Sequence, residues 1–265
     1  MNIVVCVKQT PSSTSVPVDA ATGKLKLEGL PWGLNPWDEY AVEEALRIKE
    51  KLAGSTVTVV SVGPARAEES IRACLALGCD AGVLVSDPSF EGTDSFGTSY
   101  LLSLAVRKIN GDKPVGLVLC GKQSNDYASG VIGQALAAWL EWPSAAFVRK
   151  FVSIDDKAAK VERAMEDGID ILELELPALV SVIKEINEPR LPSLRGKMAS
   201  KKAAVAKWGA AELGAQAATV GAGGRLEQVG TSTPPARGGG VLVPGATAQE
   251  KAVFLVQKLK ELKFL

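Results

Sequence analysis

Residues 117–143, LVLCGKQSNDYASGVIGQALAAWLEWP, have the residue types and spacing of a phosphate-binding segment. The apolar run before Gly121 is followed by a polar loop, and Gly130 and Gly133 then lead into a helix that we expect to end at residues 142–143. A strand, a glycine-bearing loop and a helix N-terminus in this order expose backbone N–H groups to an anion. This loop is therefore the first place at which the sequence predicts a ligand.

The glycines of this loop match neither of the two common phosphate motifs. Gly130 and Gly133 lack the first tight-turn glycine of G-x-G-x-x-G, and no Gly-Lys-Ser/Thr follows as in a Walker A loop. A plain helix start with small residues for close packing explains the pattern equally well. Asp126 and Ser129 could then cap the helix instead of contacting a ligand.

The segment NPWD at residues 35–38 is a second candidate. Its simplest interpretation is a helix N-cap with a stapling aromatic residue. In a doubly wound sheet, however, ligands bind beyond the carboxyl ends of the strands, at the point where the strand order reverses. The strand ends at Cys6, Val62 and Gly121 would converge there beside this helix start, which favours a nucleotide pocket.

The composition excludes several kinds of active site. Histidine is absent, which removes Ser-His and Cys-His nucleophiles, histidine-bearing metal sites and the usual proton shuttle at neutral pH. The 30 acidic residues balance the 30 basic ones, so no overall field favours nucleic acid or an anionic membrane. The cysteines Cys6, Cys74, Cys79 and Cys120 form no C-x-x-C pair, and we expect buried, reduced thiols.

Two features bear on location. The apolar part of the N-terminus, MNIVVCVKQTP, is too short for a signal peptide and is typical of a first strand. Nowhere does an apolar stretch approach the roughly 20 residues that span a bilayer. We therefore expect a cytoplasmic protein.

Strands and helices alternate in the first half of the chain, which predicts an α/β fold with a doubly wound, mostly parallel sheet of the Rossmann-like, adenine-nucleotide-binding type. Strands are expected at residues 3–7, 56–62, 82–85 and 115–120, and helices at residues 35–54, 67–77, 95–109 and 133–142. The segment between the first strand and Asn35 is rich in Pro, Ser, Thr and Gly, and we expect it to be a long surface loop.

The pattern changes after residue 145. Residues 160–165 and 169–176 flank a Glu-Asp-Gly turn and predict an antiparallel hairpin, followed by a buried strand at residues 178–183. A Pro, Gly and basic loop and an Ala/Gly-rich stretch then precede an amphipathic helix at residues 248–263. Either this helix docks elsewhere at the end of an extended arm, or it folds back onto its own core.

Motifs along nearly the whole chain resemble the beta subunit of electron-transfer flavoproteins. In order they are V-x-V-K at residues 5–8, NP at 35–36 with AVEEALRIKE from 41, SVGP at 61–64, GKQ from 121, GQ at 133–134, LEWP at 140–143, VER at 161–163, and NEPR at 187–190 leading into L-x-x-x-M-x-x-K-K from 194. Each motif alone is weakly specific, but their ordered set is strong.

The resemblance implies a heterodimer with a larger alpha subunit that holds most of an electron-transferring FAD. It also implies that this chain binds an adenine nucleotide of its own, AMP in housekeeping members or a second FAD in bifurcating ones. By position, the cofactor-binding residues are Cys6, Asn35, Pro36, Trp37, Asp38, Val62, Gly121, Lys122, Gln123, Ser124, Asn125, Asp126, Tyr127, Ala128, Ser129, Gly130, Val131 and Ile132.

The middle of the loop follows neither nucleotide pattern of the family. Housekeeping members carry three aspartates and then Asn-Gln-Thr, of which this chain keeps only Asp126. The bifurcating pattern D-G-D-T-A-Q-V-G is echoed only at Ile132-Gly133, whereas Thr93-Asp94 with residues 98–100 is more similar to members that hold FAD. The resemblance therefore leaves AMP and a second FAD both open.

The resemblance further implies a partner-recognition loop at residues 190–202, with Leu194 as the side chain that inserts into acyl-CoA dehydrogenases, as in fatty acid beta-oxidation. An ordinary exposed leucine is the simpler alternative. Electrons would leave for a quinone-linked or other acceptor, and a membrane would be met only through an acceptor oxidoreductase. The expected organisation is a nucleotide-binding core at residues 1–186, the recognition loop at 187–204, and an arm and helix at 205–265 that dock on the alpha subunit.

On this interpretation the protein is an electron carrier and not an enzyme, because the flavin performs the redox chemistry. Two alternatives come from other classes. An ATP-binding hydrolase or ligase of the same fold would be expected to carry S-G-G-x-D-S or a phosphate loop with a Gly-Ser pair, and neither is present. A nucleotide-sensing module without a redox role would share only the pocket.

Overall fold

The computed structural model describes residues 1–13, 16–19, 22–227, 229–232 and 238–265, and it divides the chain into two compact units. The larger unit comprises Met1–Pro17 and Leu25–Val229, and the smaller one Val18–Lys24 and Gly230–Leu265. The larger unit is described first. It contains the residues predicted to bind a cofactor, which lie on or beside the carboxyl ends of its strands, and also Leu194, the residue predicted to bind a partner.

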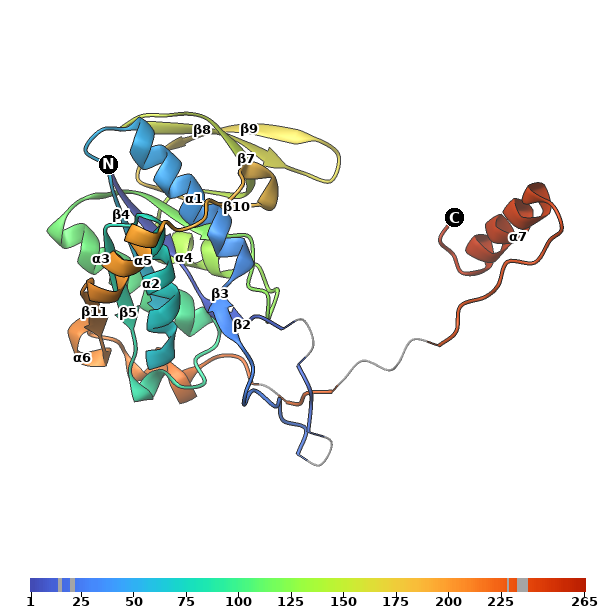
Figure 1. The fold of residues 1–265 in the computed structure, drawn as a ribbon, viewed down its shortest axis with the longest axis horizontal. Coiled ribbons are helices and arrows are strands. Elements are labelled where there is room, and N and C mark those ends of the chain that lie inside the picture. The colour runs from blue at the N-terminus through green and yellow to red at the C-terminus, as the bar shows by residue number, and fades with distance from the viewer. Residues whose placement is uncertain (14–15, 20–21, 228, 233–237) are drawn as a thin grey trace. The chain divides into compact units, whose positions relative to one another are not determined.

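A central sheet with strand order β11-β5-β4-β1-β6-β10-β7-β8-β9 organises the larger unit (Figure 1). Its strands are β1 (Asn2–Cys6), β4 (Thr56–Val62), β5 (Ala81–Val85), β6 (Val115–Gly121), β7 (Ser144–Ile154), β8 (Ala158–Ala164), β9 (Ile169–Glu175), β10 (Ala178–Val182) and β11 (Val205–Trp208). A separate antiparallel pair consists of β2 (Gln9–Pro11) and β3 (Trp32–Leu34).

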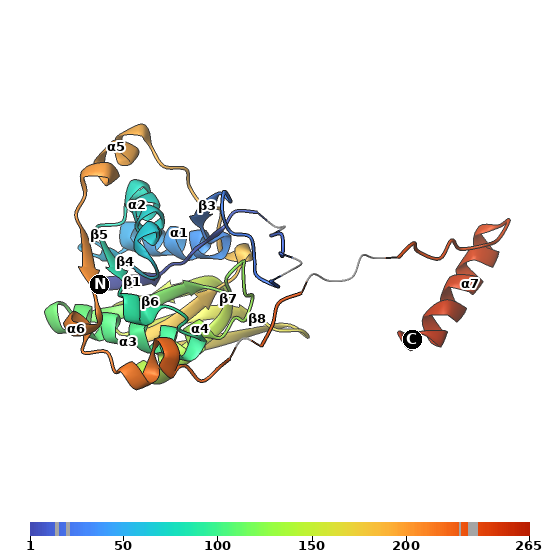
Figure 2. The same ribbon diagram turned by 90° about the horizontal axis from the view of Figure 1, so that it is seen from below.

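Helices cover both faces of the sheet. The α-helices of the larger unit are α1 (Pro36–Lys51), α2 (Glu68–Leu77), α3 (Ser95–Asp112), α4 (Ile132–Leu140), α5 (Leu194–Lys202) and α6 (Ala210–Leu213); α7 (Ala248–Glu261) belongs to the smaller unit. Short 3₁₀ turns lie at Ala65–Ala67, Pro88–Phe90, Lys184–Ile186, Ala217–Thr219 and Gly221–Gly223. Figure 2 shows α1 and α2 on one side of the sheet and α3 and α4 on the other.

The two core layers follow from the alternation of side chains along β1. Ile3 and Val5 pack with α1 and α2, whereas Val4 and Cys6 pack with α3 and α4. Successive side chains of a strand point to opposite faces, so a strand that is apolar at every position is covered on both. This arrangement explains why the first strand contains no polar alternation.

The predicted fold class is confirmed. Neighbouring strands from β11 to β7 are parallel, while β7, β8 and β9 pair antiparallel. The chain builds β4 and β5 on one side of β1 and then crosses to place β6 on the other. The strand order therefore reverses at β1, and the carboxyl ends of β1 and β6 mark the place where doubly wound sheets bind ligands.

Three strands before the C-terminal third, β2, β3 and β7, were missed in the sequence. The long loop expected before Asn35 contains β2 and β3, each of only three residues. The strand β7 was not predicted because its pairing with β8 shifts register between Val148 and Lys150 and again between Phe151 and Ser153. Such bulges interrupt the two-residue alternation by which a strand is recognised.

Two predictions for the C-terminal third are corrected by the structure. The segment expected to be a loop up to residue 202 contains α5, which Ser193 caps by accepting a hydrogen bond from the Gly196 N–H at 3.0 Å. The arm does not begin at residue 205, because β11 joins the sheet in parallel with β5 and the larger unit continues to Val229. A strand that joins an edge through backbone hydrogen bonds needs little apolar sequence, so composition did not reveal it.

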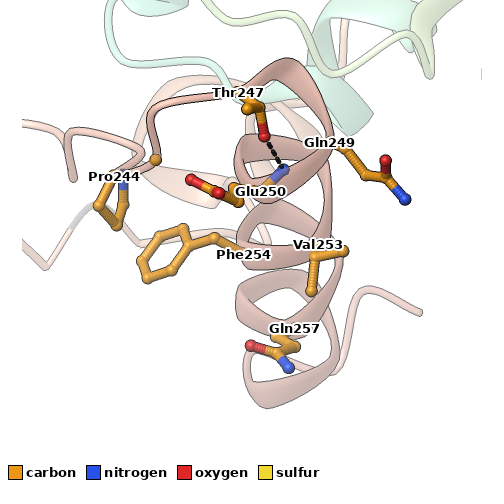
Figure 3. A pocket seen from close by; sticks show the side chains of 8 residues that line it. Pro244, Thr247, Gln249, Glu250, Val253, Phe254 and Gln257 are labelled. Atoms are coloured by element: carbon orange, nitrogen blue, oxygen red, sulfur yellow. Dashed lines mark hydrogen bonds between the residues drawn. The ribbon is translucent and has the colours of Figure 1, made fainter.

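The smaller unit contains the predicted C-terminal helix as α7. The Thr247 hydroxyl oxygen accepts a hydrogen bond from the Glu250 N–H at 3.2 Å, and the Glu250 carboxylate accepts one from the Ala246 N–H at 2.8 Å. Figure 3 shows the shallow hollow that this turn forms with the first part of the helix, including Pro244 and Phe254. In the part of the chain that the structure describes, no helix is both long and apolar enough to cross a membrane.

Candidate functional site

The strand ends predicted to converge are brought together by the sheet. Cys6, at the end of β1, is in register with Cys120 of β6 on one side and with Val60 of β4 on the other. Val62 closes β4 two residues later. The loop that follows β6, residues 121–131, is called the glycine loop below; it leads from this strand edge to α4.

Asn35 ties the start of α1 to the glycine loop. Its side chain is 1% exposed, its Nδ2 donates to the Gln123 carbonyl at 2.9 Å, and its Oδ1 accepts from the Asn125 N–H at 3.0 Å. Both ends of the carboxamide are therefore engaged within the protein. The role that the geometry gives Asn35 is to position the loop.

Asp38 lies buried at the same junction. Its Oδ2 accepts a hydrogen bond from the Lys8 backbone N–H at 2.8 Å. Burial raises the pKa of Asp38 to about 7, although hydrogen bonds from Lys8, Asn35 and Gly121 act to lower it. The first turn of α1 thus contains an acid whose charge changes near neutral pH.

Gly121 is required by the close approach of α1 to the end of β6. A Cβ atom at this position would stand 2.6 Å from the carbonyl group of Trp37 and 2.6 Å from Oδ1 of Asp38. Backbone atoms cannot move aside as the tip of a flexible side chain can. Any larger residue would therefore separate the helix start from the strand end.

Lys122 is close to two aromatic rings. Its Nζ is 5.6 Å from the ring centre of Trp37 and 5.4 Å from that of Phe147, which are distances of cation–π contacts. Phe147 adopts a left-handed backbone conformation, with φ of 58°, which is rare for an aromatic residue. Phe147 was not among the predicted site residues, because no local motif marks it.

Lys8 is a second residue that the prediction omitted. Its Nζ lies 2.7 Å from both carboxylate oxygens of Asp126, the one aspartate that the glycine loop shares with the family pattern, and 5.0 Å from the ring centre of Tyr127. The signal was present in the sequence, since Lys8 ends the V-x-V-K motif and follows the first strand.

The outer part of the glycine loop is exposed. Tyr127 is 74% exposed, and Ser129 and Val131 are exposed as well. The Ala128 N–H donates to the Ser124 carbonyl at 2.9 Å, and both Ala128 and Gly130 have positive φ. The left-handed conformation is costly for a residue with a Cβ atom, so Ala128 marks a tight turn in the loop.

Two helix N-termini beside this loop have no side-chain cap. Neither Asn35 at the start of α1 nor Val131 at the start of α4 accepts a hydrogen bond from the first turn of its helix with its side chain. In contrast, Asp94, Ser193 and Thr247 cap α3, α5 and α7. Pro36 at the start of α1 has no N–H, and the Asp38 N–H donates to the Asn35 carbonyl at 2.9 Å, so the N–H groups left without a capping side chain are chiefly those of the first turn of α4, an arrangement that binds anions.

The cysteines at the strand ends have no nucleophilic character. Burial, assisted by the charge of Asp38, raises the pKa of the Cys6 thiol to about 12, and burial raises the pKa of the Cys120 thiol well above its usual value. Within the described residues, no three His, Cys, Asp or Glu side chains come together in a way that could hold a metal ion.

The predicted partner-docking residue lies on a different element. Leu194 is the first residue of α5 and is 78% exposed, and Met198 follows one turn later at 64% exposed. The segment before α5 is fixed to α1, because Arg190 forms ion pairs with the buried Glu43 at 2.7 Å and with Glu50 at 2.6 Å. The fold therefore presents Leu194 on a short helix and not on a free loop.

Thr93 and Asp94, which resemble FAD-holding members, have a structural role in this chain. Asp94 caps α3 through Gly97 and also accepts hydrogen bonds from the N–H groups of Arg225 and Leu226, at 2.7 and 2.9 Å. The Thr93 hydroxyl accepts one from the Gly221 N–H at 2.7 Å. These residues hold the segment that follows α6.

Comparisons with known proteins agree with the motifs. The family described as "Electron transfer flavoprotein domain" matches residues 22–213. The caffeyl-CoA reductase-Etf complex subunit CarD of Acetobacterium woodii is 40% identical over 262 residues, 98% of each chain. The electron transfer flavoprotein subunit beta of Thermoanaerobacterium thermosaccharolyticum is 43% identical over 196 residues, 74% of this chain and 73% of that one. Protein FixA of Azotobacter vinelandii is 42% identical over 196 residues, 73% of this chain and 69% of that protein.

Proposed function

The chain belongs to the electron transfer flavoprotein family as a beta-type chain, and we propose on this basis that it pairs with an alpha-type subunit and binds an adenine nucleotide of its own. Members of this family are electron carriers and not catalysts, and their name implies flavin. The proposed alpha-type partner holds most of the electron-transferring FAD. The nucleotide of the beta-type chain is AMP or a second FAD.

One observation carries the nucleotide proposal. The N-termini of α1 and α4 start beside the end of β6 without side-chain caps; α2 also lacks one, whereas α3, α5 and α7 have them. A phosphate at this place would accept hydrogen bonds from backbone N–H groups of the first turn of α4 and would be stabilised by both helix dipoles. The position at the switch point of the sheet supports the same conclusion.

The side chains around these N–H groups suit AMP, or the AMP half of FAD. Lys8 and Lys122 bring positive charge to the glycine loop, while Trp37 and Phe147 add aromatic surface of the kind that packs against a purine. A Cβ atom at Gly133 would stand 2.8 Å from the Cys120 sulfur, so α4 begins in contact with the strand edge. Backbone N–H groups at this helix start would hold the phosphate of the ligand.

The chain contributes binding and orientation to the complex. When bound, the flavin supplies the electron transfer chemistry. Asn35 fixes the glycine loop against the start of α1, Asp38 fixes the main chain of Lys8 at the same junction, and Lys122 would offset phosphate charge next to the ring of Trp37. The raised pKa values of the buried thiols argue against a covalent role for cysteine.

The C-terminal helix is proposed to dock on the alpha-type subunit. Apolar side chains on and after α7 are strongly exposed: Val253, Leu255, Val256, Leu262, Phe264 and Leu265. Exposed apolar surface of this extent in one short segment is characteristic of a protein interface. Unit boundaries support an arm of residues 230–265, shorter than the one expected from the sequence.

The surface of α5 is proposed to receive the electron donor. Leu194 and Met198 are exposed one turn apart, and basic residues, among them Lys201 and Lys202, flank them on the same helix. An acyl-CoA dehydrogenase or a similar enzyme acting on CoA thioesters would be the donor, and a quinone-linked or other oxidoreductase the acceptor. The name of the relative from Acetobacterium woodii, which is part of a caffeyl-CoA reductase complex, supports a partner of this class.

Co-expression with an alpha-type subunit tests the proposal. We expect a yellow heterodimer that releases FAD and an adenine nucleotide assignable to the beta-type chain on denaturation. A colourless monomer that hydrolyses ATP would instead favour a hydrolase or ligase of this fold. A chain that binds nucleotide but neither pairs nor transfers electrons would favour a sensing module.

A further inference from the structure

We infer that Lys8 is a positioning residue for the nucleotide: by pairing with Asp126 it holds the glycine loop in the arrangement that binds the ligand, an inference that rests on the proposed function. Lys8 lies two residues after the end of β1, and Asp126 lies in the outer half of the loop. The two residues are 118 positions apart in the sequence.

The geometry of the pair is that of a specific contact. The Lys8 Nζ lies 2.7 Å from each oxygen of the Asp126 carboxylate, so one ammonium group donates to both. The same Nζ lies 5.0 Å from the ring centre of Tyr127. The ammonium group of Lys8 therefore contacts two successive loop residues, Asp126 and Tyr127.

The main chain of Lys8 is fixed at both its polar groups. Its N–H donates to Oδ2 of Asp38 at 2.8 Å, and its carbonyl accepts from the Asn35 N–H at 2.9 Å. Since Asn35 itself binds residues 123 and 125, the inner half of the loop is held from the start of α1. The Lys8 side chain extends this support from the same junction to residue 126.

Lys8 also compensates the negative charge of Asp126 in the loop. Burial acts to raise the pKa of Asp126, but the hydrogen bond and charge of Lys8 outweigh it and lower this pKa overall, so the carboxylate is ionised at neutral pH. An unpaired carboxylate would repel an anionic nucleotide bound at the N-terminus of α4. Paired with Lys8, it forms a locally neutral contact that stabilises the loop without opposing the phosphate.

Loss of the pair should lower the fraction of molecules in which the loop is ready to bind. The apparent affinity of a ligand falls by the same factor as the population of the binding-competent state. For a partly exposed ion pair we expect about a threefold to fivefold effect. Within this range Lys8→Met should have the larger effect, because it also leaves the Asp126 carboxylate unpaired near the phosphate, whereas Asp126→Asn removes the same contact without leaving a negative charge.

The test compares Lys8→Met, Asp126→Asn and the double variant in the complex with the alpha-type subunit, by titration with AMP after removal of bound nucleotide. Each single variant should weaken AMP binding about threefold to fivefold, and the double variant should be no weaker than the singles. Lys8→Arg, which preserves the charge, should stay within about twofold of the unsubstituted complex. Lys49→Met is the matched control, since it removes another interelement ion pair, the 2.6 Å contact with Asp80, outside the site.

Chymotrypsin cleavage after Tyr127, without nucleotide, gives a second readout. Cleavage in an exposed loop follows its opening, so it should be faster in Lys8→Met and Asp126→Asn than in Lys49→Met.

Unchanged cleavage and affinity in both site variants would overturn the inference. So would a loss beyond about tenfold in Lys8→Met with unchanged or tighter binding in Asp126→Asn, because Lys8 would then contact the ligand directly. A complex that binds neither AMP nor FAD in this chain would refute the proposed function itself, whatever the cleavage rates.

Discussion

The carboxamide of Asn35 donates a hydrogen bond of 2.9 Å to the carbonyl of Gln123, which connects the residue before α1 with the loop after β6. The same side chain accepts a hydrogen bond from Asn125, so two points of the glycine loop depend on one buried residue. This connection makes the loop part of the α1 junction and not an independent surface segment. The predictions below follow from that junction and from the surface on α5.

Asn35→Ala should destabilise the protein and weaken nucleotide binding together. The substitution leaves the Gln123 carbonyl and the Asn125 N–H without their partner, and each such loss in a buried place costs about 1–3 kcal/mol of unfolding free energy. Urea denaturation and AMP titration of the complex measure the two effects. Asn110→Ala is the control, because Asn110 accepts a hydrogen bond from Val115 away from the site; it should lower stability and leave AMP affinity unchanged. Equal AMP affinity in both variants would contradict the role of Asn35.

Gly121→Ala should reduce nucleotide binding far more than Gly116→Ala, although both lie on β6. The new methyl at residue 121 meets the Trp37 backbone and Asp38 at 2.6 Å, whereas the one at residue 116 meets the flexible side chain of Met1 at 2.9 Å. We expect a loss of about 1–3 kcal/mol in stability for the first variant from this overpacking. Comparable nucleotide content in the two purified variants would show that the close approach at residue 121 is not needed.

Asp38 should make the folded state less stable as the pH rises towards neutrality. Its folded pKa, about 7, lies above the usual 3.8, so the folded state binds the proton more tightly than the unfolded state does. This contribution to stability is complete below about pH 4, is lost at up to about 1.4 kcal/mol per pH unit as the pH rises, and is fully lost above about pH 7.

Urea denaturation between about pH 5 and pH 7.5 measures this dependence, in a range above the titration of the acids whose pKa values are lowered, such as Asp126. Asp38→Asn should flatten the dependence on pH in that range. If the variant lost stability with pH as steeply as the unsubstituted chain, another group would be responsible.

Leu194→Ala should slow electron transfer with the partner dehydrogenase while leaving the fold and the flavin spectrum unchanged. A side chain that is 78% exposed contributes little to the stability of the free protein, so we expect a change within about 0.5 kcal/mol. Leu226→Ala is the control, because Leu226 is 69% exposed on a different segment. The rate of flavin reduction by the donor is measured in both variants. Equal rates would show that Leu194 does not contribute to docking of the donor.

Arg190→Ala should destabilise the larger unit and also slow the same electron transfer. Its removal leaves Glu43 buried without its strongest partner, and for a pair whose arginine is about one-third exposed we expect a loss of about 1–3 kcal/mol. Because Arg190 holds the segment before α5, the position of Leu194 depends on it. Arg195→Ala, an exposed residue of α5, is the control for loss of positive charge. Full stability in Arg190→Ala would mean that the ion pairs do not anchor this segment.

Much of the fold could be predicted because the first half of the chain combines continuous apolar strands with helices at regular intervals. The missed elements were missed for separate physical reasons. The register shifts in β7 disturb the alternation of side chains, and β11 is held by backbone pairing to β5 that composition does not report. The helix α5 begins at the cap Ser193, in a segment rich in proline and basic residues, and its C-terminal carbonyls accept hydrogen bonds from Arg72, a long-range contact that composition does not report.

The candidate site could be predicted in its parts but not in its connections. The loop from Gly121 and the helix start at Asn35 each have a local pattern. Their hydrogen bonds, however, join residues 88 and 90 positions apart, and the contact of Lys8 with Asp126 spans more. Phe147, which reaches Lys122 from β7, has no signal of its own. Long-range contacts of this kind arise from the strand order, which local periodicity does not encode.

The nucleotide released from the purified complex tests the central claim most directly. After denaturation of the heterodimer with its alpha-type subunit, mass spectrometry and absorbance should find either AMP together with one FAD, or two FAD, per heterodimer. The nucleotide of the beta-type chain should be lost in Gly121→Ala and retained in Gly116→Ala. A complex that releases a single FAD and no further adenine nucleotide, with or without these substitutions, would contradict the proposal that the glycine loop and the start of α1 bind one.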